Sequence, residues 1–362
     1  MKESEVIRTI LKTFPDSGIG DDTATIEIDG KVFCFSCDAS VEGVHFRREY
    51  STLRQIVEKL ITSNVSDIYA SGCRPCDFLL TAGLPAGFSQ KDLQEVLGGL
   101  KSACEYYSVK LVGGDTVLSP GRLFFNVSIR GVPEGERTVH RKGARPGDRI
   151  AVYGGFGCSI VGLYILEYLF SVDGGEERAG KVLSDKVLDF IDANRDRLKE
   201  IAGKIDIGDE WVDKERERDI EALVVNCMRQ HLVPVACPLP RELLLKHAEY
   251  LRAGIDISDG LAIDLSHVCQ ASGVSAVLYE EKLVALSPIQ GLLKPSSDTT
   301  RFIVSSGEEY SLVLAVAPDI TEDIAQFASI IGEFVEGTGE LSLVRSDGKA
   351  IPLDTAGYEH TF

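Results

Sequence analysis

The sequence predicts an α+β protein with mixed α/β elements, built from two domains, on three observations. The chain has 362 residues, 44% of them hydrophobic, which is more than a comfortable single core and ample for two. Strand and helix signals alternate up to about Gly135. The run Pro133-Glu-Gly-Glu136 is typical of a link between domains. We therefore expect an N-terminal sheet-and-helix domain over residues 1–137 and a C-terminal α/β domain over residues 138–362.

The first predicted strands form a hairpin. Residues Thr25 to Ile28 and Val32 to Cys37 have strand character and are joined by a turn at Asp29-Gly30. Asp22 comes just before this hairpin and Asp38 directly after it. The hairpin can therefore bring two carboxylates to one end of a sheet.

A long helix is predicted over Leu53 to Ser71, where the apolar residues form one stripe. Asn64 and Asp67, three positions apart, lie together beside that stripe. The helix can thus direct a carboxylate into a site. The capping-box sequence Ser89-Gln-Lys-Asp92 predicts the start of a second helix that continues through Tyr107.

Three more strands are predicted in this half, over Phe78 to Leu84, Lys110 to Val112 and Leu123 to Gly131. The sequence Gly113-Gly-Asp-Thr116 follows the second of them, and we expect it to form a turn because glycine permits a sharp change of chain direction.

The second half is expected to alternate in the same way. Arg149 to Tyr153 predicts a strand, and a glycine-rich turn then leads to a helix from Ser159. The sequence Gly254-Ile-Asp-Ile-Ser-Asp-Gly260 should open another helix. Ala276 to Tyr279 and Arg301 to Ser305 are predicted to be strands.

A charge-rich helical segment is predicted near residues 173–231, between the glycine-rich turn and a proline-rich loop. Its apolar residues form a narrow stripe, which gives the helices one face to bury: Val182, Leu183, Val187, Phe190 and Ile191. No motif in the segment indicates a binding role, and we expect it to lie at the periphery.

The charge balance excludes two classes of partner. The formal net charge is −18, so nucleic acid and an anionic membrane surface would both be repelled. An anionic substrate would need bridging cations. The most apolar stretch, Ile150 to Phe170, is interrupted by glycines and Glu167, which does not suit a membrane span. No secretory signal is visible at the N-terminus, and we expect a cytoplasmic protein.

Nine cysteines without a secretory context do not predict a disulfide framework. Two Cys-x-x-Cys pairs, Cys34/Cys37 and Cys73/Cys76, raise the possibility of zinc or redox chemistry. The first pair lies on a predicted strand, where residues three apart point to opposite faces. The second follows a predicted helix instead of opening one, so no helix N-terminus lowers a thiol pKa there. Structural cysteines are the favoured interpretation.

Neither standard nucleotide-binding motif is present. The chain has no Gly-x-x-x-x-Gly-Lys-Ser/Thr loop, and Gly155-Phe-Gly-Cys-Ser-Ile160 lacks the third glycine of the dinucleotide fingerprint. That turn could still offer backbone N–H groups to an anion at a helix start, although close packing of strand and helix would explain its glycines equally well.

Seven aspartates occur in short glycine- or serine-rich segments along the whole chain. They are Asp21, Asp22, Asp38, Asp67, Asp115, Asp256 and Asp259. Any one of them could be ordinary turn chemistry. Together they predict a site for Mg²⁺, because short carboxylates supply the hard oxygen ligands that Mg²⁺ prefers and that bridge it to phosphate.

Five segments, in order, resemble thiamine-monophosphate kinase, a family of the aminoimidazole-ribonucleotide synthetase-like ATP-binding superfamily. The segments are Gly18-Ile-Gly-Asp-Asp22, Ser36-Cys-Asp-Ala-Ser-Val-Glu-Gly-Val-His-Phe46, Asn64-Val-Ser-Asp-Ile68, Gly113-Gly-Asp-Thr116 and Asp256-Ile-Ser-Asp-Gly-Leu261. The run from Val41 to Phe46 points to this family within the superfamily. The resemblance implies ATP-dependent phosphorylation of thiamine monophosphate to the diphosphate by direct in-line transfer, on a homodimer joined through its N-terminal strands.

The resemblance also implies the site residues. Metal ligands for several Mg²⁺ ions would be Asp22, Asp38, Asp67, Asp115, Asp256 and Asp259. ATP, the co-substrate, would contact Ser36, Gly114, Asp115, Arg141 and Ser258, and the catalytic residues would be Asp115, Arg141 and Asp259. Thiamine monophosphate would contact His45, Glu308 and Thr355. A bound Mg²⁺ would neutralise phosphate charge, and Arg141 would be a fixed cation for the transferred group.

The chain departs from the family pattern at four positions. Cys37 stands where threonine is usual, Ser306 and Glu309 replace a glycine and an aspartate, and Thr355 stands where a tryptophan often stacks on the substrate. The alternatives are therefore another Mg-ATP-dependent kinase or synthetase of the superfamily, acting on a different small phosphate or amine, and a non-catalytic ATP-binding dimer.

Overall fold

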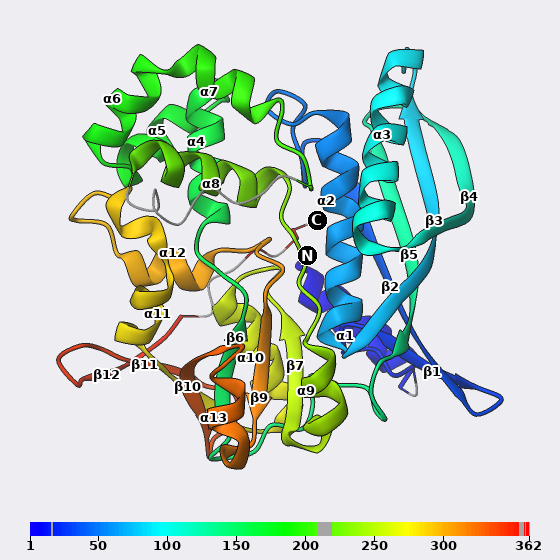
Figure 1. The fold of residues 1–362 in the computed structure, drawn as a ribbon, viewed down its shortest axis with the longest axis vertical. Coiled ribbons are helices and arrows are strands. Elements are labelled where there is room, and N and C mark those ends of the chain that lie inside the picture. The colour runs from blue at the N-terminus through cyan, green and yellow to red at the C-terminus, as the bar shows by residue number, and fades with distance from the viewer. Residues whose placement is uncertain (16, 209–218, 355–357, 359, 362) are drawn as a thin grey trace.

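Two β-sheets and a layer of helices make up the computed structural model, which describes residues 1–15, 17–208, 219–354, 358 and 360–361 (Figure 1). The mixed α/β class expected from the sequence is confirmed. The smaller sheet is built from residues before 137 and the larger from residues after it, and the domain boundary at that position stays a prediction.

The smaller sheet has the strand order β1-β2-β5-β3-β4. Its strands are β1 (Ala24–Ile28), β2 (Lys31–Val41), β3 (Cys73–Pro85), β4 (Lys110–Ser119) and β5 (Phe124–Pro133). β3 and β4 are parallel and are joined by α3 (Gln90–Tyr107), whereas the other pairs are antiparallel. The predicted hairpin and the predicted helix after Ser89 are therefore confirmed.

Helix α2 (Leu53–Ala70) lies between the smaller sheet and the rest of the molecule (Figure 1). It begins with a capping box, in which the Thr52 hydroxyl accepts from the N–H of Gln55 and the Gln55 side chain accepts from the N–H of Thr52. It packs against β2 and β5 on one side and against the larger sheet and the helical layer on the other. Side chains of α2 can therefore reach both halves.

The larger sheet has the order β12-β11-β8-β10-β6-β9-β7. Its strands are β6 (Arg149–Tyr153), β7 (Leu251–Asp256), β8 (Ser275–Tyr279), β9 (Leu312–Val316), β10 (Ser329–Val335), β11 (Leu341–Val344) and β12 (Ala350–Pro352). β8 and β11 are parallel and the other pairs antiparallel. Every residue of β9 is buried, which explains its continuous apolar sequence.

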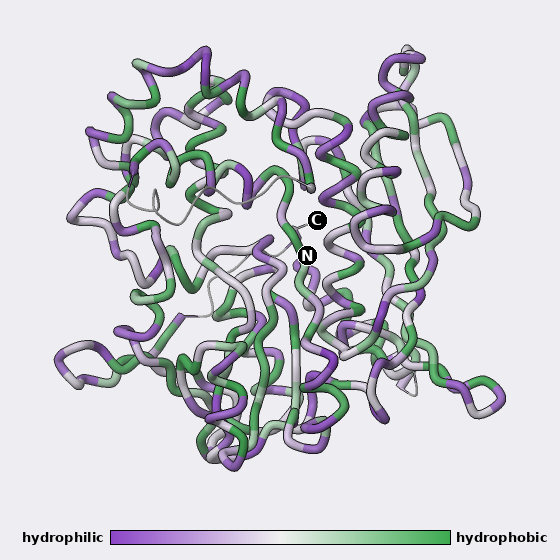
Figure 2. The backbone as a smooth tube through the Cα atoms, in the orientation of Figure 1, coloured by the Kyte–Doolittle hydropathy of each residue, from purple (hydrophilic) through white to green (hydrophobic). Residues whose placement is uncertain are grey.

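The helical layer contains α4 (Ser159–Leu169), α5 (Gly175–Val182), α6 (Asp185–Ala193), α7 (Arg195–Ala202) and α8 (Ile220–Leu232). Figure 2 shows hydrophilic and hydrophobic residues alternating along the outer helices, whereas the central strands of the larger sheet are mostly hydrophobic. The predicted apolar stripe is confirmed, since Leu183, Val187 and Ile191 are fully buried. Residues 209–218 of this predicted segment lie outside the described part of the chain.

The remaining elements are α-helices and short 3₁₀ helices, which are labelled η. They are α1 (Glu3–Thr13), α9 (Arg241–Lys246), η2 (Ala248–Tyr250), α10 (Leu261–Ser272), α11 (Glu280–Leu286), η3 (Pro288–Gly291), α12 (Thr299–Ser305), η4 (Pro318–Ile320) and α13 (Thr321–Ile324). None of the helices described is both long and apolar enough to cross a membrane.

Two local predictions are wrong. Residues 301–305 belong to helix α12 and not to a strand; Asp298 caps this helix by accepting from the N–H of Arg301 at 3.1 Å. Gly113 to Thr116 lie inside β4, paired with β3, and do not form a turn. Gly114 has φ +156°, and a Cβ there would collide with the carbonyl oxygen of Leu80. The close approach of two strands therefore requires this glycine.

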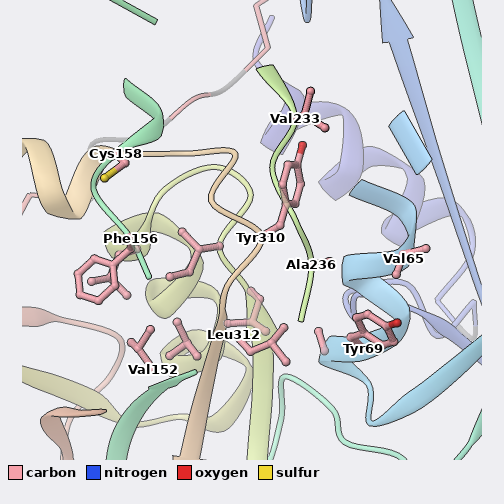
Figure 3. Close-up of a cluster of buried hydrophobic side chains, with 14 of the residues drawn as sticks. Val65, Tyr69, Val152, Phe156, Cys158, Val233, Ala236, Tyr310 and Leu312 are labelled. Atoms are coloured by element: carbon pink, nitrogen blue, oxygen red, sulfur yellow. The ribbon is translucent and has the colours of Figure 1, made fainter. Parts of the chain in front are cut away.

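Buried apolar residues form one continuous cluster that joins the two sheets (Figure 3). Val65 and Tyr69 come from α2, Leu312 comes from β9, and Val233 and Ala236 come from the segment after α8. An apolar contact of this extent fixes the two sheets relative to each other. A site that draws residues from both is therefore preorganised.

Polar contacts join α2 to the segment after α7. The Gln55 amide donates to the carbonyl oxygens of Ala202 and Ile205, at 2.7 and 3.0 Å. The Arg54 side chain donates to Glu58 at 3.1 Å and forms an ion pair with Asp206. Burial and, second, a hydrogen bond with Asp206 together raise the pKa of Glu58 to about 9, so Glu58 is protonated at neutral pH and donates to Asp206.

We expect the protein to lose stability as the pH rises toward 9. The raised pKa of Glu58 means that the folded state holds this proton more tightly than the unfolded state. The stabilisation is complete below the ordinary pKa of 4.5 and is lost as the pH passes the folded value of about 9. Melting temperatures across this range should fall less in Glu58→Gln, which keeps a donor without a titrating proton. Glu200→Gln on α7 is the control, and equal slopes for both variants would contradict the prediction.

Candidate functional site

Three carboxylates from distant parts of the chain converge beside α2. Asp22 precedes β1, Asp67 lies near the C-terminal end of α2, and Asp256 is the last residue of β7. One carboxylate oxygen from each lies within 4.8 Å of the others. This spacing allows a single cation to contact all three, and the oxygen-only donor set fits Mg²⁺.

Burial raises the pKa of each of these carboxyl groups. The pKa of Asp22 is raised to about 6 and that of Asp256 to about 8, because removal from water penalises the ionised form. The pKa of Asp67 is raised well above its usual value, by burial and then by the charge of Asp38. The cluster is thus short of positive charge, which a bound cation would supply.

Hydrogen bonds from β2 and α2 hold the cluster. The Ser36 hydroxyl donates to Asp67, and the Asn64 side chain accepts from the backbone N–H of Asp38 at 3.1 Å. The Ser66 hydroxyl donates to Asp256 at 2.6 Å, which ties α2 to the larger sheet. Contacts between β2 and α2 therefore bring the charge of Asp38 near Asp67.

His140 and Arg141 neutralise the two aspartates of the first motif. The Arg141 Nε donates to Asp22 at 3.0 Å in an ion pair, and its backbone N–H donates to Asp21 at 3.0 Å. The His140 Nδ1 lies 2.8 Å from Asp21, and this carboxylate raises the pKa of the imidazole. The predicted ATP ligand Arg141 thus lies at the acidic cluster, although its side chain is only 24% exposed.

The loop after β7 is fixed by a residue that the motifs did not reveal. Asp264, in the first turn of α10, accepts from the backbone N–H groups of Ser258, Asp259 and Gly260 at 3.0–3.1 Å. The sequence did carry a signal for Asp264, because an acidic residue in the first turn stabilises a helix N-terminus. The loop therefore presents Asp259, whose pKa burial raises to about 6, to the same cavity as the cluster.

A cavity of 1470 Å³ extends from the acidic cluster to a second group of polar residues. There, Lys59 Nζ lies 2.7 Å from the Glu308 carboxylate and donates to the carbonyl oxygen of His231 at 3.0 Å. The His231 ring lies 3.5 Å from the other Glu308 oxygen. His45, predicted to contact the same substrate as Glu308, also lines the cavity. Its Nδ1 accepts from the N–H of Val41. Lys59 and His231 were not found from the sequence.

One face of α2 connects the two ends of this cavity. Lys59, Ser63 and Asp67 are spaced four residues apart and all three line the cavity. Residues at this spacing share a helix face, and eight residues cover about 12 Å of axis. Helix α2 thus sets the separation between the carboxylates and the lysine.

The departures Ser306 and Glu309 form a structural pair. The Glu309 carboxylate accepts from the N–H groups of Gly157 and Ser159, at 2.8 and 2.9 Å, and from the Ser306 hydroxyl at 2.5 Å. Burial raises the pKa of Glu309 to about 7. The anion at the glycine-rich turn and the start of α4 is therefore an internal carboxylate.

Glu308 and Tyr310 flank Glu309 with φ values of +56° and +51°, a conformation that costs energy for non-glycine residues. The backbone in this loop is thus held against its preference. Because the same loop carries Glu308, it places that carboxylate beside Lys59.

Several predicted residues lie elsewhere. Gly114 and Asp115 are on exposed β4 and do not line the cavity, and the Asp115 carboxylate accepts from the N–H of Thr116. Cys37 is exposed on β2 while Cys34 is buried, as strand alternation predicts. Thr355 lies outside the described residues. The individual roles of all the predicted site residues stay predictions.

Comparison with known proteins agrees with this geometry. Residues 20–132 match the family described as AIR synthase related protein, N-terminal domain. The thiamine-monophosphate kinase of Aquifex aeolicus (strain VF5) is 29% identical over 360 residues, covering 99% of this chain and 97% of the relative. That of Pyrococcus horikoshii is 26% identical over 362 residues, covering 99% and 96%. A solved structure described as AaThiL complexed with AMPPCP and TMP has a TM-score of 0.73 at 27% identity, covering 99% of this chain and 97% of that one.

In its N-terminal part, over residues 20–132, the chain is similar to AIR synthase related N-terminal domains. Along its whole length it is similar to thiamine-monophosphate kinases, which confirms the predicted resemblance. The predicted enzyme class, a kinase, agrees with these relatives. A HypE–HypF complex, with a TM-score of 0.62 at 18% identity, shares the fold alone.

Proposed function

We propose that the protein transfers the terminal phosphoryl group of ATP to thiamine monophosphate and so forms thiamine diphosphate. One observation carries the proposal: a single cavity has a carboxylate cluster at one end and the Lys59–Glu308 pair at the other. Two phosphate groups must approach each other in this reaction, so each needs its own positive charge. A relative of similar fold was solved with an ATP analogue and TMP, which supports both substrates.

Asp22, Asp67 and Asp256 would hold Mg²⁺, with Asp38 and Asp259 beside them. When bound, the ion would neutralise phosphate oxygens. Ser36 and Ser258, which line the cavity, would contact the nucleotide, and the always-charged Arg141 would stabilise the transferred group.

The acceptor would lie toward His45 and Glu308. The Lys59 ammonium would bind its phosphate, because it is the cation nearest to Glu308 among the contacts of the described residues. The departures Ser306 and Glu309 bond to each other and to α4, so they leave this end of the cavity unchanged. The relatives named above favour thiamine monophosphate over a different small phosphate or amine.

The assay is direct. Purified protein with Mg-ATP and thiamine monophosphate should yield equal amounts of ADP and thiamine diphosphate. If ADP forms only with another small phosphate or amine, that compound and not thiamine monophosphate is the acceptor. ATP binding without turnover would indicate a non-catalytic dimer. Transfer from ATP chiral at the γ-phosphorus should invert its configuration, as one in-line displacement requires, whereas a phosphoenzyme would retain it.

We also propose that the protein is a homodimer joined through the outer face of the smaller sheet. Phe35, Leu79 and Val117 are exposed apolar residues of this sheet, and β4 is an edge strand exposed along almost its whole length. Such a face invites association with a second copy. Asp115 lies on the same strand, so dimerisation would bring a partner chain close to it.

We expect Leu79→Asp to convert the dimer to a monomer, because a charge would then have to be buried in the contact. Light scattering at micromolar concentration measures the mass. Leu97→Asp on α3 is the matched control, since Leu97 is similarly exposed at 46% against 50% but lies on a helix. A wild-type protein that is monomeric would contradict the proposal outright.

A further inference from the structure

Two cysteine thiols meet inside the smaller sheet. The Sγ atoms of Cys34 and Cys73 are 2.9 Å apart, and the side chains are 0% and 3% exposed. A disulfide requires about 2.05 Å, so a small movement of the side chains would allow the bond. Cys34 lies on β2, and Cys73 is the first residue of β3.

The surrounding fold explains why these thiols can meet although their strands are not neighbours. β5 lies between β2 and β3, and its Gly131 pairs with Cys34 on one side and with Pro75, two residues after Cys73, on the other. Cys73 also contacts the carbonyl oxygen of Ser71, at 3.5 Å. The pair is therefore built from three segments and is not an accident of one loop.

The environment also favours a nucleophilic sulfur. The hydrogen bond with Cys73, aided by those with Thr23 and Thr25, outweighs the opposite effect of burial and lowers the pKa of the Cys34 thiol to about 7. Thiolates are the attacking species in disulfide exchange, so Cys34 would react first.

We propose that Cys34 and Cys73 are an oxidisable dithiol that forms an intramolecular disulfide. The thiolate of Cys34 attacks a disulfide oxidant and releases one thiol. The sulfur of Cys73 then loses its proton, attacks Cys34 and expels the second thiol. Two protein thiols thus lose two hydrogens, and the oxidant disulfide is reduced to two thiols.

The cross-link would join β2 to the start of β3, close to the contact that holds Asp67 of the acidic cluster. Ser36, two residues after Cys34, donates to Asp67 on α2, and Cys73 follows α2 by three residues. The disulfide would close a loop between positions 39 residues apart, which restricts the unfolded chain. The oxidised protein should therefore melt at a higher temperature than the reduced protein.

The test uses an excess of oxidised dithiothreitol, applied to the native protein and, separately, during refolding. Mass spectrometry should show the loss of two hydrogens, peptide mapping should find Cys34 linked to Cys73, and reduction should reverse the rise in melting temperature. Mapping is needed because Cys158 and Cys227 also contact each other. Cys104→Ser, at a partly exposed unpaired site, should behave as wild type.

Cys73→Ser should lose the linked peptide and the shift in melting temperature, and Cys34→Ala serves if that variant does not fold. The proposal is wrong if neither oxidised sample contains the Cys34–Cys73 link. It is also wrong if the shift in melting temperature persists in the Cys73 variant. Both readouts are independent of kinase activity.

Discussion

Replacing Asp67 with asparagine is expected to abolish phosphoryl transfer while leaving the protein folded. The change keeps the size of the side chain but removes one of the three carboxylates that lie within 4.8 Å of one another. Loss of an outer partner of a metal site typically costs roughly 10- to 100-fold, and loss of a direct ligand should cost more. We therefore expect at least about a 100-fold fall in kcat.

The same variant should lose activity without losing thermal stability. Asp67 is buried beside other carboxylates, which raises its pKa and makes its charge unfavourable without a cation. Asp67→Asn should melt at or above the wild-type temperature without ligand, yet gain little from Mg²⁺ with a non-hydrolysable ATP analogue. Thermal melts with and without these ligands provide the measurement.

Asp189→Asn, on the exposed face of α6, is the control and should match the wild type in both assays. Near-normal ATP-dependent activity of Asp67→Asn across a Mg²⁺ titration would show that the aspartate motifs serve turns and packing. The proposed function would then lose its chemical basis.

The second large effect is expected at Lys59. Lys59→Met keeps the length and apolar stem of the side chain but removes the charge beside Glu308. A hydrogen bond to a charged group contributes about 1.5–3 kcal/mol, so kcat/KM for thiamine monophosphate should fall roughly 10- to 100-fold. The KM for ATP should change little, because the nucleotide is proposed to bind at the carboxylate end.

Lys181→Met is the matched control for this variant. Lys181 lines the same cavity, but its side chain is 71% exposed and pairs with Glu177 on its own helix. Steady-state kinetics with each substrate varied in turn separates the two ends of the cavity. An equal fall in both specificity constants would place Lys59 in a structural role.

Local sequence signals predicted most of the elements. The Asp29-Gly30 turn and the Ser89 capping box were recognised because a few adjacent residues determine each of them. The strand predicted at residues 301–305 failed because the apolar, β-branched pattern of five residues fits a buried strand and a buried helix equally well. The turn predicted at Gly113-Gly114 is wrong because only the pairing of β3 with β4 reveals that these glycines permit close approach of two strands.

The site residues also divide into those found from local motifs and those brought together only by packing. Asp22, Asp67 and Asp256 each lie in a motif, so their convergence in one place could be predicted. Lys59 and His231 are 172 residues apart and meet only through the packing of α8 against α2. A lysine within an amphipathic helix carries no pattern that separates it from a surface residue.

The single face of α2 that carries Lys59, Ser63 and Asp67 has a consequence for substrate choice. A helix buried on both sides behaves as a spacer of fixed length, so the two ends of the cavity cannot move apart to admit a longer acceptor. Under the proposed function, acceptors would thereby be selected by their reach as well as by their charge. Insertion of one residue between Lys59 and Asp67 would rotate one end by about 100° relative to the other, and the enzyme would keep both groups yet lose their alignment.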